Sequence, residues 1–114
     1  MKKPQIKKLD DLWSKKIKDI AGWECEHCGK TSRLNSHHIF SRSNQAIRWE
    51  IPNGICLCVG CHTFSSVFSA HKTPLEFVDW LREVRGEKWE ASLRAKACQK
   101  LTKDFDEIKA ELTE

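Results

Sequence analysis

The fold is decided by residues 25–62, CEHCGKTSRLNSHHIFSRSNQAIRWEIPNGICLCVGCH. Two Cys-x-x-Cys pairs open and close this stretch. The four cysteines are Cys25, Cys28, Cys58 and Cys61. Each pair lets two thiolates converge on one ion, so together the pairs predict a tetrahedral structural Zn²⁺ site. At 114 residues the chain is near the size at which such a metal adds needed stability.

The other metal-binding side chains of this stretch are histidines. A His37-His38 doublet lies between the cysteine pairs, and His62 follows the second pair directly. Imidazoles suit a second divalent ion, and an unligated imidazole beside it can act as a general base near neutral pH. Other interpretations stay open: the doublet supplies zinc ligands or ordinary polar residues, and Asn53, before Gly54, is only a turn residue. A closed four-cysteine site needs no further histidines, which favours the second metal.

The composition indicates the cellular setting. The N-terminus, Met1-Lys2-Lys3-Pro4, has no apolar run behind it, so we expect reduced cysteines in a phage or bacterial cytoplasm rather than a secreted disulfide scaffold. No stretch approaches the roughly 18 to 20 apolar residues that a membrane span requires. A soluble protein without a membrane partner is the expectation.

The formal net charge of +4 is unevenly distributed. Residues 1–73 carry twelve Lys and Arg against six acidic residues, whereas residues 74–114 carry eight against ten. Four thiolates around one Zn²⁺ add about −2, so part of the basic excess is local compensation. Its position around the histidines nevertheless favours a nucleic-acid partner.

Hydrophobic spacing predicts helices on both sides of the central stretch. Residues 5–21 form an amphipathic helix that ends before Gly22. A second helix starts at Thr73-Pro74 and is closed by Gly86, with Leu75 among its inward residues. The apolar stripe of residues 89–112 predicts one long C-terminal helix of about six turns.

Between these helices the pattern predicts strand, loop, strand and helix. Residues 35–40 are expected to form a short strand, and a polar loop follows around residues 41–45. Residues 55–57, after a turn at Asn53-Gly54, form the returning strand, and residues 62–68 start a short helix.

The predicted class is therefore α+β, with all 114 residues in a single domain. Residues 1–22 form its N-terminal helix and residues 23–72 a core of paired zinc knuckles. Residues 73–114 form two C-terminal helices.

The joint order of Cys-x-x-Cys, His37-His38, Asn53 and Cys-x-x-Cys-His62 resembles the HNH endonucleases. The likeness is to phage-type members that combine a ββα-metal core with a four-cysteine structural zinc. It covers residues 25 to about 71 and says nothing specific about the flanking helices.

This resemblance implies a role for each motif residue. His37 and His62 would bind one catalytic divalent ion, which is Mg²⁺, Mn²⁺, Ni²⁺ or Zn²⁺. His38 would be the general base, and Asn53 would tie the loop together and help to orient His38. The implied reaction is hydrolysis of a DNA phosphodiester to 5′-phosphate and 3′-hydroxyl ends.

Several residues outside the motif have open roles. Four basic residues lie close in sequence to the metal residues and are candidates for phosphate contacts: Arg33, Arg42, Arg48 and Lys72. His71 is a phosphate contact, a replacement ligand or a partly exposed histidine before a helix. Cys98 is expected to be a small core residue.

Two further interpretations concern partners. Arg48-Trp49 adds a weaker similarity to phage recombination proteins of the NinG/Rap type, which favours a structure-selective recombination nuclease. The stripe of residues 89–112 is compatible with a homodimer. A different function class is a zinc-knuckle nucleic-acid-binding or adaptor module, without cleavage activity, in a packaging or recombination machine.

Overall fold

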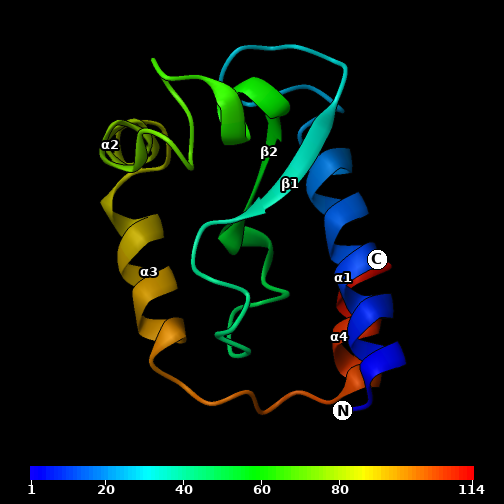
Figure 1. Ribbon diagram of the computed structural model, residues 1–114. Helices are drawn as coiled ribbons and strands as arrows, with labels where there is room; N and C mark the ends of the chain where they lie inside the picture. Colours follow the sequence, from blue (N-terminus) through cyan, green and yellow to red (C-terminus); the bar gives the residue numbers. More distant parts are fainter.

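The computed structural model describes residues 1–114 as a two-stranded antiparallel sheet between groups of helices (Figure 1). This arrangement confirms the α+β class. None of the helices combines the length and hydrophobicity needed to cross a membrane. The elements in chain order are α1 (Lys3–Ile20), β1 (Leu34–His38), the 3₁₀ turn η1 (Ile51–Asn53), β2 (Gly54–Cys58), the π-helical turn η2 (Gly60–Phe64), α2 (Pro74–Arg85), α3 (Glu87–Ala97) and α4 (Phe105–Leu112).

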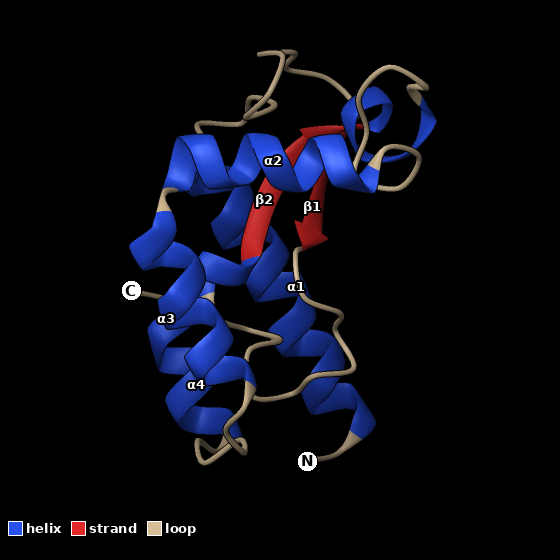
Figure 2. Cartoon of the chain, turned by 90° about the vertical axis from the view of Figure 1, so that its left-hand side faces the viewer, coloured by secondary structure: helices blue, strands red, loops and turns tan.

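Strand β2 is buried along its whole length because helices cover both of its faces. Ile55 and Leu57 belong to a core shared with α2, whereas Cys56 belongs to a second core shared with α1 and α4. This alternation follows from the two-residue period of a strand. Figure 2 shows α2 crossing one face of the two strands. The sheet therefore separates two apolar clusters along residues 55–57 of β2, and Leu34 of β1 contacts both clusters.

Helix α1 is amphipathic, as predicted, and buries a stripe at four-residue spacing: Leu9, Trp13 and Ile17. Helix α4 packs beside it (Figure 1) and adds Ile108 and Leu112 to the same cluster. The N-terminal and C-terminal segments of the chain thus complete one core together.

The predicted single C-terminal helix is wrong. Helix α3 ends at Ala97, residues 98–104 form a connection, and α4 begins at Phe105, so three helices follow η2 instead of two. Asp104 starts α4 as its N-cap by accepting a hydrogen bond from the Glu107 N–H at 2.9 Å. The two halves of the predicted apolar stripe pack against different helices, because α3 contacts α2 while α4 contacts α1. Cys98, in the connection, is exposed rather than part of the core.

Smaller differences concern the turns and one side chain. Residues 39–53 form a long connection between the strands, so Asn53-Gly54 is not a tight hairpin turn but the junction of η1 and β2. The helical turn after the second cysteine pair covers residues 60–64 instead of 62–68. Leu75 is exposed rather than inward, whereas Phe77 is buried in α2.

Gly54 is a close-packed position at the start of β2. A Cβ atom there would lie 2.5 Å from Ile17 Cγ1 and 2.7 Å from Trp13 Cζ2. In the sheet register Gly54 is paired with His38. The missing side chain therefore lets α1 approach the sheet beside His38.

Gly54→Ala is expected to lower the free energy of unfolding by about 1–3 kcal/mol, because the added methyl group overlaps α1. Urea unfolding followed by tryptophan fluorescence measures this change. Gly60→Ala is the matched control, since its nearest neighbour, Cys58 Sγ, would be at 3.8 Å. Equal stability of the two variants would contradict the close packing of α1 on β2.

Candidate metal centres

The four cysteines of the two pairs meet in one cluster, with all Sγ atoms within 4.8 Å of one another. Cys25 and Cys28 lie in the turn after α1, Cys58 ends β2, and Cys61 lies in η2. The Cys28 and Cys58 sulfurs are 3.5 Å apart, close to the separation of about 3.8 Å expected in a tetrahedral zinc–thiolate site. The cluster therefore fits a structural Zn²⁺.

Without a metal, the surroundings favour a thiolate at Cys58 and neutral thiols at Cys28 and Cys61. The Cys28 N–H points at Cys25 Sγ and the Cys61 N–H at Cys58 Sγ, each at 3.5 Å. Burial opposes ionisation of Cys58, but hydrogen bonds from Cys61 and the other thiols outweigh it and lower the pKa of Cys58 to about 7. Burial raises the pKa of Cys28 and Cys61. Four negative sulfurs at these distances require a cation among them, so metal binding and thiol deprotonation are coupled.

A second cluster consists of three imidazoles: His37, His62 and His71. His62 Nε2 lies 3.1 Å from His37 Nδ1 and 3.1 Å from His71 Nε2. One ring nitrogen carries at most one proton, so His62 Nε2 cannot donate to both neighbours. The nitrogens are spaced as ligands of one ion would be, since metal–nitrogen bonds of about 2.1 Å place two ligands about 3.4 Å apart.

Backbone hydrogen bonds explain how His71 reaches His62 from nine residues away. The His71 N–H donates to the His62 carbonyl at 3.1 Å, and the Ala70 N–H donates to the Cys61 carbonyl at 2.9 Å. Ser69 is fully buried, and its N–H donates to Thr73 Oγ1 at 2.8 Å, which closes the turn that carries His71. The structure therefore brings His71 into the cluster, a position from which it could act as the replacement ligand considered from the sequence.

The environment keeps the inner imidazoles neutral. Burial, followed by the positive charge that His62 and His71 would carry, lowers the pKa of His37 to about 3. Burial, followed by His71, also lowers the pKa of His62. Thr63 Oγ1 lies 3.3 Å from His62 Nδ1 and can accept its proton, leaving Nε2 free for a metal. His37 and His62 are thus neutral at pH 7, the state in which an imidazole can bind a metal.

His38 lies on the other face of β1 and is not part of this cluster. Its ring stacks on Trp13 of α1 with the centroids 3.9 Å apart and the planes within 7°. Its Nε2 is 3.0 Å from the Arg48 carbonyl oxygen. A carbonyl oxygen only accepts, so Nε2 carries the proton and Nδ1 holds the lone pair. Burial lowers the pKa of His38, and the resulting neutral imidazole can accept a proton at Nδ1.

Asn53 is completely buried, and its side chain closes the connection between the strands. Its Oδ1 accepts from the Phe40 N–H at 2.7 Å, and its Nδ2 donates to the Phe40 and Ile47 carbonyls at 3.2 Å. Three hydrogen bonds to the backbone on both sides of the connection fix its shape. Asn53 thus acts on the loop that begins beside His38 instead of reaching the histidine cluster.

The four basic residues proposed for phosphate contact have different surroundings. Arg33, Arg42 and Lys72 are exposed. Arg48 is not free, because its guanidinium donates to both carboxylate oxygens of Asp10 at 3.0 and 2.7 Å. Asp10 could not be found from the sequence, since no local pattern links it to a residue 38 positions away.

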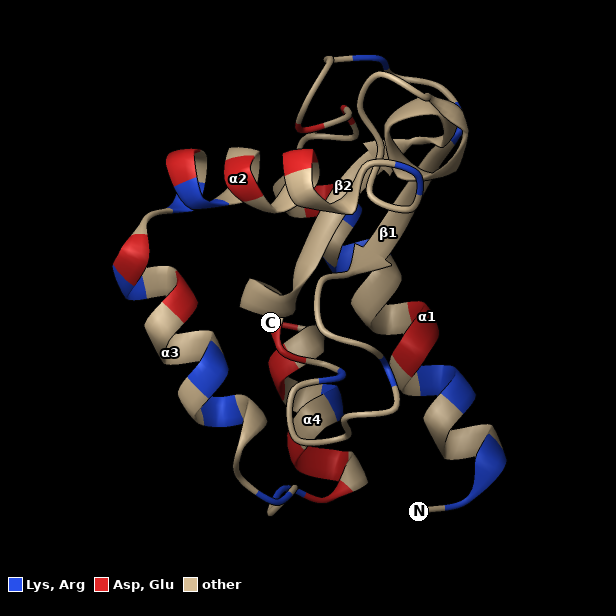
Figure 3. Cartoon of the chain, turned by 60° about the vertical axis from the view of Figure 1, so that its left-hand side comes forward, with Lys and Arg blue, Asp and Glu red and all other residues tan.

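Acidic residues are sparse near the histidines. Glu50 is the only one between His27 and Leu75. Figure 3 shows acidic residues on the helices, including α2, α3 and α4. The segments that join the three histidines thus add little negative charge, and Glu76 of α2 is the acidic residue that follows His71.

Comparison with known proteins found no match among family models, curated proteins or solved structures.

Proposed function

We propose that this chain is a metal-dependent DNA endonuclease of the HNH type. The observation that carries the proposal is the convergence of the His37, His62 and His71 nitrogens beside a separate four-cysteine cluster. A structural zinc accounts for the thiols but leaves three imidazoles aimed at one point. A metal-assisted phosphodiester hydrolase uses such a second centre.

The residues around the histidine cluster suit a phosphate substrate. A divalent ion bound there would supply positive charge for the scissile phosphate and the leaving oxygen. Glu50 is the only acidic residue between His27 and Leu75, and Glu76 follows His71 by five positions, so the segments that join the three histidines add little negative charge against the substrate. Arg33, Arg42 and Lys72 are exposed and available to contact the phosphate backbone.

His38 is the residue that we assign as the general base. It ends β1, whose residues are all partly exposed, and it leaves the strand on the face opposite to His37. A phosphodiester lying across the end of β1 would meet both imidazoles. With Nε2 occupied by the Arg48 carbonyl, Nδ1 is the atom that would take the proton of the attacking water.

The ligand set predicts a metal preference. Three imidazoles without a carboxylate suit Mn²⁺, Ni²⁺, Co²⁺ or Zn²⁺, whereas Mg²⁺ prefers oxygen ligands. We expect nicking of supercoiled plasmid to be at least about tenfold faster with one of these transition ions than with Mg²⁺. Agarose gels of reactions containing each ion or EDTA measure this. A folded, zinc-loaded protein that is inactive with every ion would instead favour a binding or adaptor module.

His71→Ala tests the third ligand without relying on activity. Titration of the zinc-loaded protein with Co²⁺, followed by visible absorption, should show at least about tenfold weaker binding at the histidine site. Lys72→Ala is the matched control, because it removes an exposed neighbour that offers no ligand. Unchanged Co²⁺ affinity in His71→Ala would remove His71 from the ligand set.

A further inference from the structure

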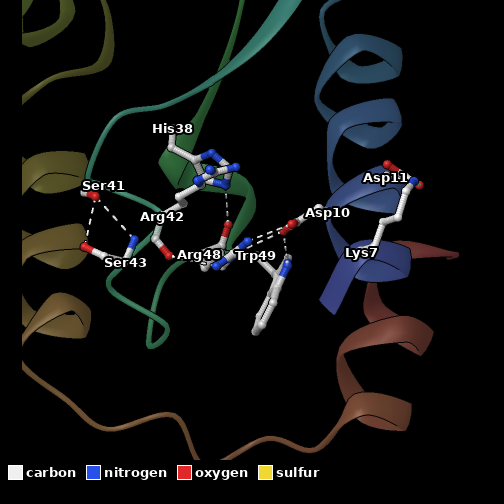
Figure 4. A network of polar contacts seen from close by, with 9 residues as sticks. All are labelled: Lys7, Asp10, Asp11, His38, Ser41, Arg42, Ser43, Arg48 and Trp49. Atoms are coloured by element: carbon white, nitrogen blue, oxygen red, sulfur yellow. Dashed lines mark hydrogen bonds and ion pairs between the residues drawn. The ribbon is translucent and has the colours of Figure 1, made fainter. Parts of the chain in front are cut away.

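Two residues of α1, three positions apart on one helix face, hold the segment that contacts His38. Asp10 accepts from the Arg48 guanidinium through both oxygens, and its Oδ1 also accepts from Trp49 Nε1 at 2.9 Å. Trp13 Nε1 donates to the Glu50 carbonyl at 3.0 Å. Residues 48–50 are thus attached to α1 at three consecutive positions, and Figure 4 shows the contacts of Asp10.

This segment and α1 together fix His38 in two directions. The Arg48 carbonyl receives the His38 Nε2–H, while Trp13 stacks on the face of the ring. The hydrogen bond sets the rotation of the imidazole in its plane, and the stacking sets the plane itself. The stacking comes directly from α1, and the Arg48 carbonyl is tied to α1 through Asp10, so both constraints depend on a helix outside residues 25–71.

We propose that Asp10 is a positioning residue for His38, because it holds Arg48 so that the Arg48 carbonyl keeps His38 in the Nε2–H tautomer with Nδ1 free. The inference rests on the proposed function in that His38 is the base whose orientation matters. It extends that function by making α1 part of the active site.

The contacts of Asp10 differ from those of an ordinary surface acid. Its carboxylate forms a bidentate pair with Arg48, whose side chain is only 14% exposed, and such pairs impose a defined geometry. Arg48 Nη1 also donates to the Arg42 carbonyl at 3.2 Å, which extends the restraint to the loop after β1. Asp11, the next residue, pairs only with Lys7 on the exposed surface of α1 (Figure 4). Such an exposed pair contributes little to stability.

Asp10→Asn is the decisive variant, and Asp11→Asn is its matched control. Asparagine keeps the size of the side chain but removes the bidentate acceptor for Arg48. Long-range ¹H–¹⁵N NMR of the imidazoles reports the tautomer of His38, and nicking kinetics give kcat and KM. Asp10→Asn should lose the single Nε2–H tautomer and about tenfold in kcat with KM unchanged. Asp11→Asn should match the wild type in both measurements.

The same experiment separates this inference from the proposed function. If Asp10→Asn retains the wild-type tautomer and kcat, Asp10 does not position His38. If the wild type cleaves nothing, the nuclease proposal fails, while the tautomer still decides whether Asp10 orients the ring. Should Asp10→Asn not fold, Arg48→Lys keeps the backbone carbonyl and the charge but loses the bidentate pair. It is expected to show the same loss of tautomer and kcat, and wild-type behaviour of this variant would overturn the inference.

Discussion

Cys58→Ser is expected to unfold the centre of the protein. Cys58 ends β2, is buried, and belongs both to the sulfur cluster and to the core shared with α2. A structural zinc contributes about 10–16 kcal/mol in small zinc domains, whereas whole domains are stable by only about 5–15 kcal/mol. Loss of one ligand should therefore abolish the cooperative thermal transition. Circular dichroism melting and the zinc content of the purified protein measure this.

Cys98→Ser provides the control for this experiment. Cys98 is exposed in the connection between α3 and α4 and lies outside the cluster. The variant should bind zinc and melt as the wild type does. A soluble Cys58→Ser protein with a normal melting transition would contradict the four-cysteine zinc site.

His38→Ala is expected to lower the rate of DNA cleavage by about 10²–10⁴-fold, the usual contribution of a general base. Neither metal cluster includes His38, so zinc content and Co²⁺ binding should remain. Single-turnover cleavage of a labelled duplex gives the rate, and a gel-shift assay gives the DNA affinity. Cleavage near the wild-type rate would remove His38 from the role of base.

The stacking of His38 on Trp13 calls for a second variant. Alanine also removes this contact, so a fall in stability could lower activity for another reason. His38→Phe keeps an aromatic ring against Trp13 but has no nitrogen. Inactivity of a normally melting His38→Phe protein would assign the effect to the imidazole.

The features of this structure that depend on neighbouring residues could be predicted from the sequence. The Cys-x-x-Cys spacing brings two thiols together within one turn, and the apolar periods of α1 and α2 place these helices within about two residues of their observed bounds. The first strand, predicted over residues 35–40, is observed at Leu34–His38. Each of these features depends on neighbours a few positions away.

Features that depend on distant partners could not be predicted in this way. The position of His71 depends on hydrogen bonds to the backbone of Cys61 and His62. The ion pair of Asp10 with Arg48 joins residues far apart in sequence, and neither carries a local pattern that reveals the other. The break between α3 and α4 was signalled by Asp104, but the apolar period continues across it. Hydrophobic periodicity does not determine which of the two cores each half of the stripe packs against.

The direct succession of Cys61 and His62 in η2 has a thermodynamic consequence. An ion held by Cys61 would order the backbone that aims His62, so occupancy of the two candidate centres would be linked. Such linkage is reciprocal, and each ion would raise the affinity of the other by the same factor. The chain would then bind its two ions cooperatively. Removal of zinc would weaken ion binding at the histidine cluster even while the second ion was still abundant.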